Sequence, residues 1–461
     1  MSAPIQTLPF EILSDIMLLA VELDPALQFC MDSMTLSLSQ VCSSWRQVAL
    51  QTPELWLREL PLVRMEPLQT RVASAATTLL LRRSADLPVA IHVCKQLPPM
   101  RRGLAQMLDA VHDVAHRWGR LTFVSLGADE EMNMLARVPG GKLQSLKTLD
   151  LRLESGEIWT SPNSDVFTSA PHLCDVSLHM ENSPGVLPMP WAQLTRLSVN
   201  VSTAKLVTSQ WLTDVAVHPA VTLEHLEVLD IRMTVRSLGE DLGPFFRRLR
   251  LPTLKSLTLS LNFKFAGDIG FASHLAPDLE FFLSHAQKVE KLDLEDCIYA
   301  EDMPAILAHT PQLTHLGFAD SDVNVAVDDD FLRALTYTGH RLVPKLRDLR
   351  LRQLVPKFSE TALGDMIKSR WWPDASDDSG VTKLERLTLD WNKTVVNGRF
   401  KDGTFTSDFR QALWLYRKQG LRFGGIRTEL PEVRVYPGPP STNSDGTKRS
   451  PKKKEKKRKQ Q

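Results

Sequence analysis

The feature that most constrains the fold is a repeated pattern of apolar residues, apolar-x-x-apolar-x-apolar. It recurs at irregular intervals of 21 to 38 residues. The units are Leu121/Val124/Leu126, Leu146/Leu149/Leu151, Leu173/Val176/Leu178, Leu194/Leu197/Val199, Leu226/Leu229/Ile231, Leu254/Leu257/Leu259, Val289/Leu292/Leu294, Leu313/Leu316/Phe318, Leu346/Leu349/Leu351 and Leu384/Leu387/Leu389. The last three residues of each unit alternate between apolar and polar, as in a strand with one buried face. Such a chain is expected to stack its units rather than to fold around one compact core.

Apolar residues at helical spacing between the units predict helices. The predicted helices are Leu104–Trp118, Leu279–His285, Ala305–His309, Phe331–Tyr337 and Ala362–Ile367. One strand and one helix cannot bury their apolar faces alone, so stacked units would share a core behind a parallel sheet. We therefore predict an α/β solenoid over residues 121–430. A strand at Val89–Val93 would precede it, and a helix and cap at Phe405–Phe423 would close it.

The repeat resembles the leucine-rich repeat. The consensus of that family places Asn or Cys three positions after the third apolar residue. Asn262, Cys297 and Asn392 occupy this position. Other units depart from it, with Glu154, Glu181, Ser202, Thr234 and Leu354 in its place. The resemblance therefore implies a degenerate, irregular array.

A separate helical segment is predicted at residues 1–60. Its first helix has an apolar face at helical spacing, formed by Ile12, Leu13, Ile16, Leu19 and Leu23. Pro9 suits the first turn, where a missing N–H is tolerated. A second apolar run extends from Leu36 to Ala49. Three short helices with this much apolar surface would be marginal alone, so a partner is expected to supply further burial.

The order of residues in this segment resembles the F-box. The motif reads Leu8-Pro9-x-Glu11-Ile12-Leu13-x-x-Ile16, then Val41-Cys42-x-x-Trp45-Arg46-x-Val48-Ala49, then Leu55-Trp56. The resemblance covers roughly residues 6–57, with a longer gap between Leu19 and Leu36 than in a typical F-box. It implies binding of a Skp-type adaptor that links to a cullin complex. The residues so implied are Leu8, Pro9, Ile12, Leu13, Ile16, Val41, Cys42, Trp45, Leu55 and Trp56. The alternative is a helical cap on the repeat array, with Trp45 and Trp56 as core.

Candidate substrate-binding residues come from the polar positions of the predicted strands. In such a solenoid these positions lie on the concave face. Arg152, Arg232, Arg350 and Arg352 stand out, because the planar guanidinium fork pairs with carboxylate or phosphate. Acidic neighbours would weaken an anion site, and the alternative is a solvated strand face of mixed charge.

Charge is distributed unevenly along the chain. The net charge is +1, but residues 448–459 contain nine Lys or Arg and one Glu, a charge of +8, which leaves −7 elsewhere. Residues 431–461 are predicted to form a disordered basic tail, because the segment has too few apolar residues to order itself. The cluster resembles a nuclear-localisation signal read by an importin, formed by Lys448, Arg449, Lys452, Lys453, Lys454, Lys456, Lys457, Arg458 and Lys459. The alternatives are a solubilising tail and a nonspecific nucleic-acid contact.

The sequence contains no pattern typical of an enzyme. GxSxG, HExxH, GxGxxG and a phosphate-binding loop are all missing. His112 and His116 share a helical face but lack a third metal ligand. No cofactor and no metal are expected. No stretch approaches the roughly 20 apolar residues of a membrane helix, so no membrane partner is expected.

The leading hypothesis is a non-catalytic, substrate-recognition subunit of a Skp–cullin–F-box ubiquitin ligase, nuclear, cytoplasmic or both. Residues 1–60 would be the F-box, and residues 61–120 would lead into the array. The repeats would bind a protein substrate. Two alternatives stay open: a leucine-rich-repeat scaffold outside ubiquitination, and a nuclear protein associated with nucleic acid.

Overall fold

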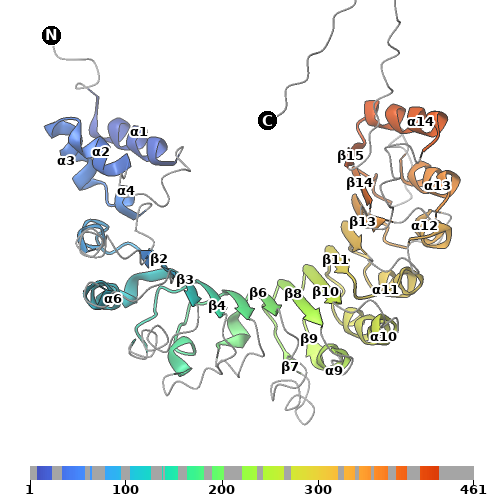
Figure 1. The fold of residues 1–461 in the computed structure, drawn as a ribbon, viewed down its shortest axis with the longest axis horizontal. Coiled ribbons are helices and arrows are strands. Elements are labelled where there is room, and N and C mark those ends of the chain that lie inside the picture. The colour runs from blue at the N-terminus through green and yellow to red at the C-terminus, as the bar shows by residue number, and fades with distance from the viewer. Residues whose placement is uncertain are drawn as a thin grey trace, which may run out of the picture.

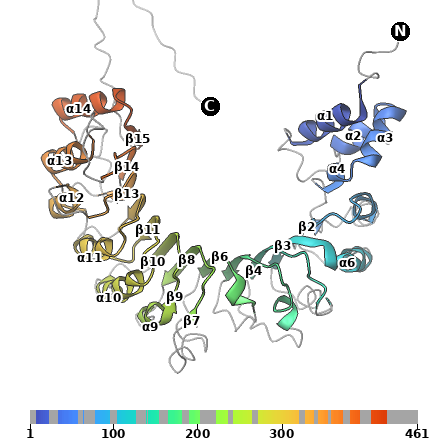
Figure 2. The same cartoon turned by 180° about the vertical axis from the view of Figure 1, so that it is seen from behind.

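The chain forms an arc with strands on its inner side and helices on its outer side (Figure 1). The computed structural model describes residues 8–22, 34–57, 63–64, 78–94, 104–125, 138, 141–153, 164–180, 189–201, 221–235, 242–263, 271–319, 327–337, 342–354, 358–371, 381–391 and 405–424. The predicted tail and nuclear signal lie outside these residues. Seen from behind, a block of helices and the last helix again lie at opposite ends of the arc (Figure 2).

The inner side of the arc is one 13-stranded sheet. Its strands are β1 (Val63–Arg64), β2 (Val89–Cys94), β3 (Trp118–Ser125), β4 (Thr148–Leu153), β5 (Asp175–Met180), β6 (Arg196–Val201), β8 (Val228–Val235), β10 (Ser256–Phe263), β11 (Lys291–Glu295), β12 (His315–Ala319), β13 (Asp348–Leu354), β14 (Arg386–Trp391) and β15 (Arg422–Gly424). All neighbouring strands are parallel. A second, two-stranded sheet pairs β7 (Val221–Thr222) with β9 (Leu249–Arg250). The predicted α/β solenoid with a parallel sheet is confirmed.

The outer side carries the connecting helices. The α-helices of the array are α6 (Leu104–Asp113), α9 (Gly243–Arg248), α10 (Phe271–Ser284), α11 (Met303–Ala308), α12 (Asp329–Leu335), α13 (Glu360–Arg370) and α14 (Ser407–Lys418). Short 3-10 turns are described at Ala115–Arg117, Ser164–Phe167, Trp191–Gln193 and Ala300–Asp302. The five predicted helices of the array all exist, with shifted ends. α10 begins earlier than predicted and contains Pro277, and the first prediction ran past α6 into β3.

The register of the strands lines up equivalent residues across the sheet. One continuous row runs through His92, Thr122, Asp150, Ser177, Ser198, Asp230, Thr258, Asp293, Gly317, Arg350, Thr388 and Gly424. The alternate residues of each strand, such as Leu149 and Leu151, are fully buried against the helices. Because side chains alternate between the two faces of a strand, the row lies on the concave face. Cys297, at the consensus position, is buried and its thiol donates to the carbonyl of Leu259 at 3.7 Å.

The first predicted unit is out of register. β3 pairs Leu121 with Leu149 and Val124 with Arg152, so Leu121 occupies the second position of the pattern rather than the first. The first position belongs to Trp118, which is fully buried. The prediction of the unit beginning at Leu121 is therefore wrong by three residues. Its cause is an aromatic residue standing where the other units have an aliphatic one.

The N-terminal helical block consists of α1 (Phe10–Glu22), α2 (Met34–Gln40), α3 (Ser43–Gln51) and α4 (Glu54–Leu57). The block has its own small core, separate from the core of the array. Three hydrogen bonds fix the packing of its helices. Ser14 and Thr52 hydroxyls lie 3.1 Å apart, the Thr35 hydroxyl donates to the Leu55 carbonyl, and Trp56 Nε1 donates to the Ala49 carbonyl at 2.7 Å.

Helical residues 78–83 connect the block to the array. Leu80 packs into the core of the block, and the next residue, Leu81, packs into the core of the array. Arg83 lies over the ring of Trp56, 4.3 Å from its centroid. Buried Arg117 donates from Nε to the Leu87 carbonyl, from Nη1 to the Leu81 carbonyl, and from Nη2 to the backbone and hydroxyl of Ser84. The connection is therefore packed on both sides.

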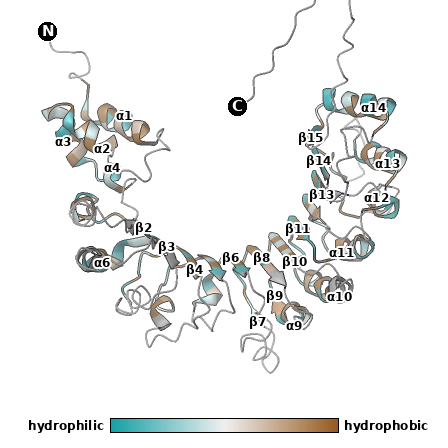
Figure 3. Ribbon diagram, in the orientation of Figure 1, coloured by the Kyte–Doolittle hydropathy of each residue, from teal (hydrophilic) through white to brown (hydrophobic). Residues whose placement is uncertain are grey.

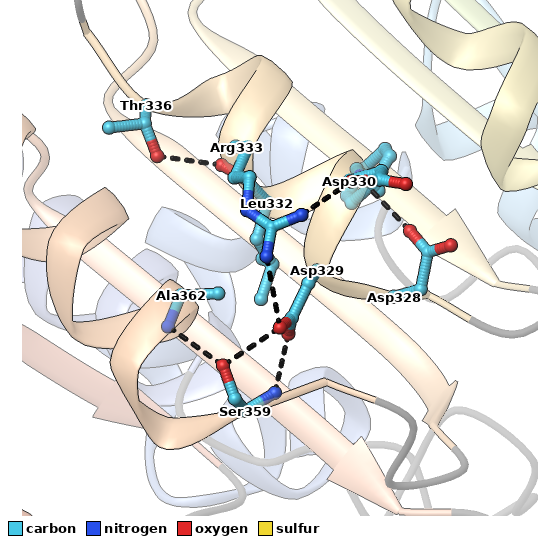
Figure 4. Close-up of polar contacts among 9 residues, drawn as sticks. Asp328, Asp329, Asp330, Leu332, Arg333, Thr336, Ser359 and Ala362 are labelled. Carbon is cyan, nitrogen blue, oxygen red and sulfur yellow. Dashed lines mark hydrogen bonds and ion pairs between the residues drawn. The ribbon is translucent and has the colours of Figure 1, made fainter.

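The starts of the last three helices are joined by carboxylates, and Figure 4 shows the first of these links, between α12 and α13. Asp329, in the first turn of α12, accepts from the backbone N–H and the hydroxyl of Ser359, which caps α13. Glu360, the first residue of α13, accepts in the same way from Thr406, which caps α14. We call this chain of contacts the cap relay. Each acid satisfies the N-terminal groups of the next helix, where negative charge is favoured.

Candidate interaction surfaces

The helix α1 is apolar on two sides. Leu13 and Met17 are buried in the block, whereas Ile12, Ile16 and Leu19 are 47%, 40% and 56% exposed. Residues spaced by four and three positions share one helix face, so these three form a stripe, which we call the apolar stripe. Figure 3 shows α1 mostly in the hydrophobic colour, unlike α14.

The stripe offers free apolar surface that a partner could cover. Fully burying one Ile or Leu side chain contributes roughly 1.5–3 kcal/mol. About half of each stripe residue is already covered. Covering the remainder would therefore contribute roughly 2–4 kcal/mol, which a helix or groove of a partner could supply.

The residues predicted to bind an adaptor fall into two groups. The exposed ones are Pro9, Ile12, Ile16 and Val41, while Leu8, Cys42 and Trp45 are partly buried. Leu13, Leu55 and Trp56 are buried in the core of the block. These last three side chains therefore support the surface from beneath and do not form part of it. Cys42 also caps α3, with its sulfur 3.5 Å from the backbone nitrogen of Trp45.

The concave sheet face carries the predicted substrate-binding arginines, but it does not bring them together. Arg152 lies on β4, Arg232 on β8, and Arg350 and Arg352 on β13. At about 4.8 Å per strand, Arg152 and Arg350 are separated by roughly 34 Å along the sheet. A single anion site formed by all four residues is therefore excluded by their positions.

Two of these arginines are neutralised by their own strands. Arg152 pairs with Asp150 at 3.1 Å, and Arg232 pairs with Asp230 at 3.1 Å. In both cases the acid lies two residues earlier, on the same face of the strand. The hydrogen bond that Arg232 donates to Asp230 raises the pKa of Arg232 above its ordinary value. These positions show the mixed-charge strand face that the sequence left open as an alternative.

Arg352 is held by acids of another strand. Its Nη2 lies 2.5 Å from Oδ1 of Asp293, and its Nη1 lies 3.7 Å from Oε2 of Glu295. Both acids are on β11, so the guanidinium reaches across β12. Gly317 on β12 leaves the space: a Cβ there would lie 2.4 Å from Oδ1 of Asp293.

Arg350 belongs to a different arrangement, centred on buried Asp348. Arg350 donates to both carboxylate oxygens of Asp348, with Nη2 at 2.9 Å from Oδ2. Arg386 on β14 donates from Nη1 to the same Oδ2 at 3.4 Å. The hydrogen bond that Arg350 donates to Asp348 raises the pKa of Arg350. Burial lowers the pKa of neighbouring His315, which therefore adds little positive charge at neutral pH.

Arg386 and Arg422 are basic residues of this face that were not predicted. Register pairs Asp348 with Arg386 and Arg386 with Arg422, so they lie side by side on β13, β14 and β15. The signal was present in the sequence. The residue just before the second apolar position of a unit also faces the concave side, and only the residues after it were considered.

Among solved structures, the chain has distant neighbours. No protein-family model and no curated protein matches it. A chain of the TLR13–ssRNA13 complex is 15% identical and has a TM-score of 0.33, over 62% of this chain and 40% of that chain. A chain of the Rad7–Elc1 complex in yeast is 12% identical and has a TM-score of 0.35, over 82% of this chain and 97% of that chain. The match with the chain of the TLR13–ssRNA13 complex thus spans less than half of that chain's length. Likeness this distant supports no conclusion about function, and the fold rests on the strand topology.

The described part of the chain contains neither a membrane-spanning helix nor a cluster of metal-binding side chains. No described helix is long and apolar enough to cross a membrane. Among the same residues, no group of three or more His, Cys, Asp or Glu side chains is placed to hold a metal ion.

Proposed function

We propose that the chain is the substrate-recognition subunit of a Skp–cullin–F-box ubiquitin ligase. The observation that carries the proposal is the apolar stripe on α1, on a helical block whose own core is already filled. The stripe lies within the segment whose order of residues resembles the F-box. In this role the chain performs no chemistry; it raises the local concentration of a substrate near a ubiquitin-conjugating enzyme.

The separation of the two surfaces supports the proposal. The stripe belongs to the block at one end of the arc, whereas the concave face extends over the array (Figure 1). A partner on the stripe therefore leaves the sheet free for a second protein. The packed connection through Leu80, Arg83 and Arg117 would hold the two partners in a defined relation.

A co-purification experiment tests the proposal. The full chain is expressed with a Skp-type adaptor and a cullin, either unchanged or as Ile12→Asp/Ile16→Asp. Two desolvated apolar contacts are lost in the variant, so we expect adaptor affinity to fall by at least about tenfold. The variant should keep the melting temperature of the parent protein, because both side chains are substantially exposed.

The matched control is Leu415→Asp on α14, which removes a leucine that is 50% exposed at the other end of the arc. This variant should retain the adaptor. Equal adaptor recovery from all three proteins would contradict the proposal. Recovery of the adaptor without the cullin would instead favour a repeat scaffold that does not act in ubiquitination.

A further inference from the structure

We propose that the concave face between β11 and β15 binds an acidic segment, rich in Asp and Glu, of a protein partner. The binding surface is formed by Lys291, Arg350, Arg386 and Arg422, which we call the basic patch. The inference rests on the proposed function only in identifying the partner with the ligase substrate. Docking of the acidic segment does not itself depend on the adaptor.

The patch is built by strand register. Lys291, His315, Asp348, Arg386 and Arg422 occupy one row across β11, β12, β13, β14 and β15. The row spans four strand spacings, roughly 19 Å. Arg350 lies two residues after Asp348 and thus on the same face. The cations are therefore strung along a line and do not converge on one point.

The charge balance of the patch is unlike that of the opposite half of the sheet. Four cations stand beside one acid, Asp348, in the basic patch, and with Arg352, Asp293, Glu295 and Asp390 included the concave face of β11 to β15 carries five cations and four acids, a net charge of +1. On β4 to β8, by contrast, arginines are individually paired with acids. These pairs are Arg152 with Asp150, Arg196 with Asp175, and Arg232 with Asp230. Positive charge thus accumulates at the C-terminal end of the arc.

The guanidinium groups of the patch keep free donors. Within the part of the chain that the structure describes, Arg350 donates from Nε and Nη2 to Asp348, and Arg386 donates to it from Nη1. An arginine has five N–H donors, so each retains several for a ligand. Within the described residues, neither Arg422 nor Lys291 has an ion-pair partner, and both are exposed. Asp348 thus positions the guanidinium groups of Arg350 and Arg386 and leaves their remaining N–H donors available to a ligand.

Single carboxylates fit this arrangement better than a phosphate dianion. Asp348 lies beneath both guanidinium groups and would repel a concentrated double charge more strongly than a single one. The separated cations match several separated negative charges along an extended segment. Asp and Glu residues of a protein provide such charges, and each can pair with one fork.

Of the other acids near the patch, Asp390 on β14 is exposed on the concave face, and the rest are engaged or lie at the rim. Asp293 and Glu295 are held by Arg352. Glu385, at the rim, pairs with Arg347 at 3.4 Å. Glu290 precedes Lys291 at the same rim and is exposed, so it reduces the net charge there without covering Arg386 or Arg422. The free positive surface is therefore centred on β13 to β15.

The test uses the full chain and a fluorescein-labelled peptide of consecutive Glu residues that also carries a photo-crosslinker. A Gln peptide of equal length is the uncharged control, and a phosphoserine peptide is the third probe. Binding is followed by fluorescence anisotropy at low and high salt. The variants are Arg386→Ala/Arg422→Ala and, as the matched control on the same sheet face, Arg152→Ala/Arg232→Ala.

We expect the Glu peptide to bind, the Gln peptide not to bind, and the affinity to fall with salt. The Arg386→Ala/Arg422→Ala variant should lose about tenfold in affinity and the control variant less than about twofold. Crosslinks should fall within residues 342–354, 381–391 and 405–424. Equal losses in both variants, crosslinks confined to residues 448–459, or binding of the phosphoserine peptide alone would each overturn the proposal.

The two proposals can fail separately. The Arg386→Ala/Arg422→Ala variant should still co-purify with the adaptor. Ile12→Asp/Ile16→Asp should still bind the Glu peptide. Loss of peptide binding alone rejects the acidic partner, and loss of adaptor binding by the unchanged chain rejects the ligase role.

Discussion

At the scale of single residues, Gly317 shows how one missing side chain permits a long-range contact. Arg352 and Asp293 lie on strands separated by β12, and their charged groups meet above Gly317. The three nearest atoms to a Cβ at this position all belong to Asp293. The glycine is therefore explained by the carboxylate above it, without any unusual backbone conformation.

This geometry predicts a change of sign for Gly317→Ala. In the unchanged chain, the new methyl group should displace Asp293 from Arg352 and destabilise the fold by up to about 1 kcal/mol, as expected for a partly exposed pair. In an Asp293→Ala background, the same substitution should stabilise by roughly 0.5 kcal/mol, because alanine loses less backbone entropy than glycine. Thermal melts of the four proteins measure the cycle. The same effect in both backgrounds would contradict this account.

At the scale of elements, the cap relay links consecutive helices through residues that lie far apart in the sequence. Asp329 and Ser359 are 30 residues apart, and Glu360 and Thr406 are 46 apart. In each case an acid in the first turn of one helix completes the cap of the next. Bonds from Ser359 lower the pKa of Asp329, with a further contribution from Arg333.

The relay predicts a pH effect with a defined sign. The pKa of Asp329 is lower in the folded chain than its ordinary value of 3.8. Its stabilising effect is therefore complete above that value and is lost as the pH falls through the lower, folded value. We expect Asp329→Asn to lower the melting temperature at neutral pH, and the difference from the parent protein to shrink near about pH 3.

Asp330→Asn is the control for this experiment. Asp330 is 84% exposed and pairs only with Arg333 among the described residues. The Asp330→Asn substitution should leave the melting temperature nearly unchanged at either pH. A fall as large as that of Asp329→Asn would show that the effect comes from helix charge in general and not from the cap of α13.

At the scale of the whole molecule, the connection between block and array depends on Arg117. Its four hydrogen bonds hold residues 81–87 against the start of β3. The contacts continue into the block through Arg83, which lies over Trp56, and through Leu80, which packs into the core of the block. Removing the guanidinium would leave the Leu87 carbonyl without its described donor, while the Leu81 carbonyl keeps the Ser84 hydroxyl and the Ser84 carbonyl keeps the Leu87 N–H.

We expect Arg117→Met to destabilise the protein by about 3 kcal/mol, because each lost bond to a charged donor is worth roughly 1.5–3 kcal/mol and desolvation of the charge offsets part of the sum. Limited proteolysis should then cleave residues 78–88 faster than in the parent protein. The control is Arg120→Met, three residues further along, where the side chain is exposed on the concave face. Similar cleavage of both variants would argue against the proposed role of Arg117.

The repeat pattern made the sheet predictable because each buried leucine has the same neighbours in every unit. The predicted register was wrong only at β3. There Trp118 stands in place of the aliphatic residue, and Leu121-x-x-Val124-x-Leu126 matches the pattern three positions later. The small strand β15 was not predicted as a separate strand, because Leu421 and Phe423 offer only part of the pattern.

Surfaces were less predictable than strands. The pairing of Arg152 with Asp150 depends on local geometry and could be anticipated from their spacing. The basic patch depends on register between β13, β14 and β15, and the cap relay joins residues tens of positions apart. Neither the basic patch nor the cap relay leaves a short motif in the sequence.

The cap relay also bears on how the molecule would yield under mechanical load. Each of its links passes from one helix only to the next. Tension applied at the C-terminal end would therefore be resisted first by the pairing of β15 with β14, next at Thr406, and then at Ser359 once α14 had detached. The C-terminal end of the array should therefore unfold in separate steps, one helix at a time.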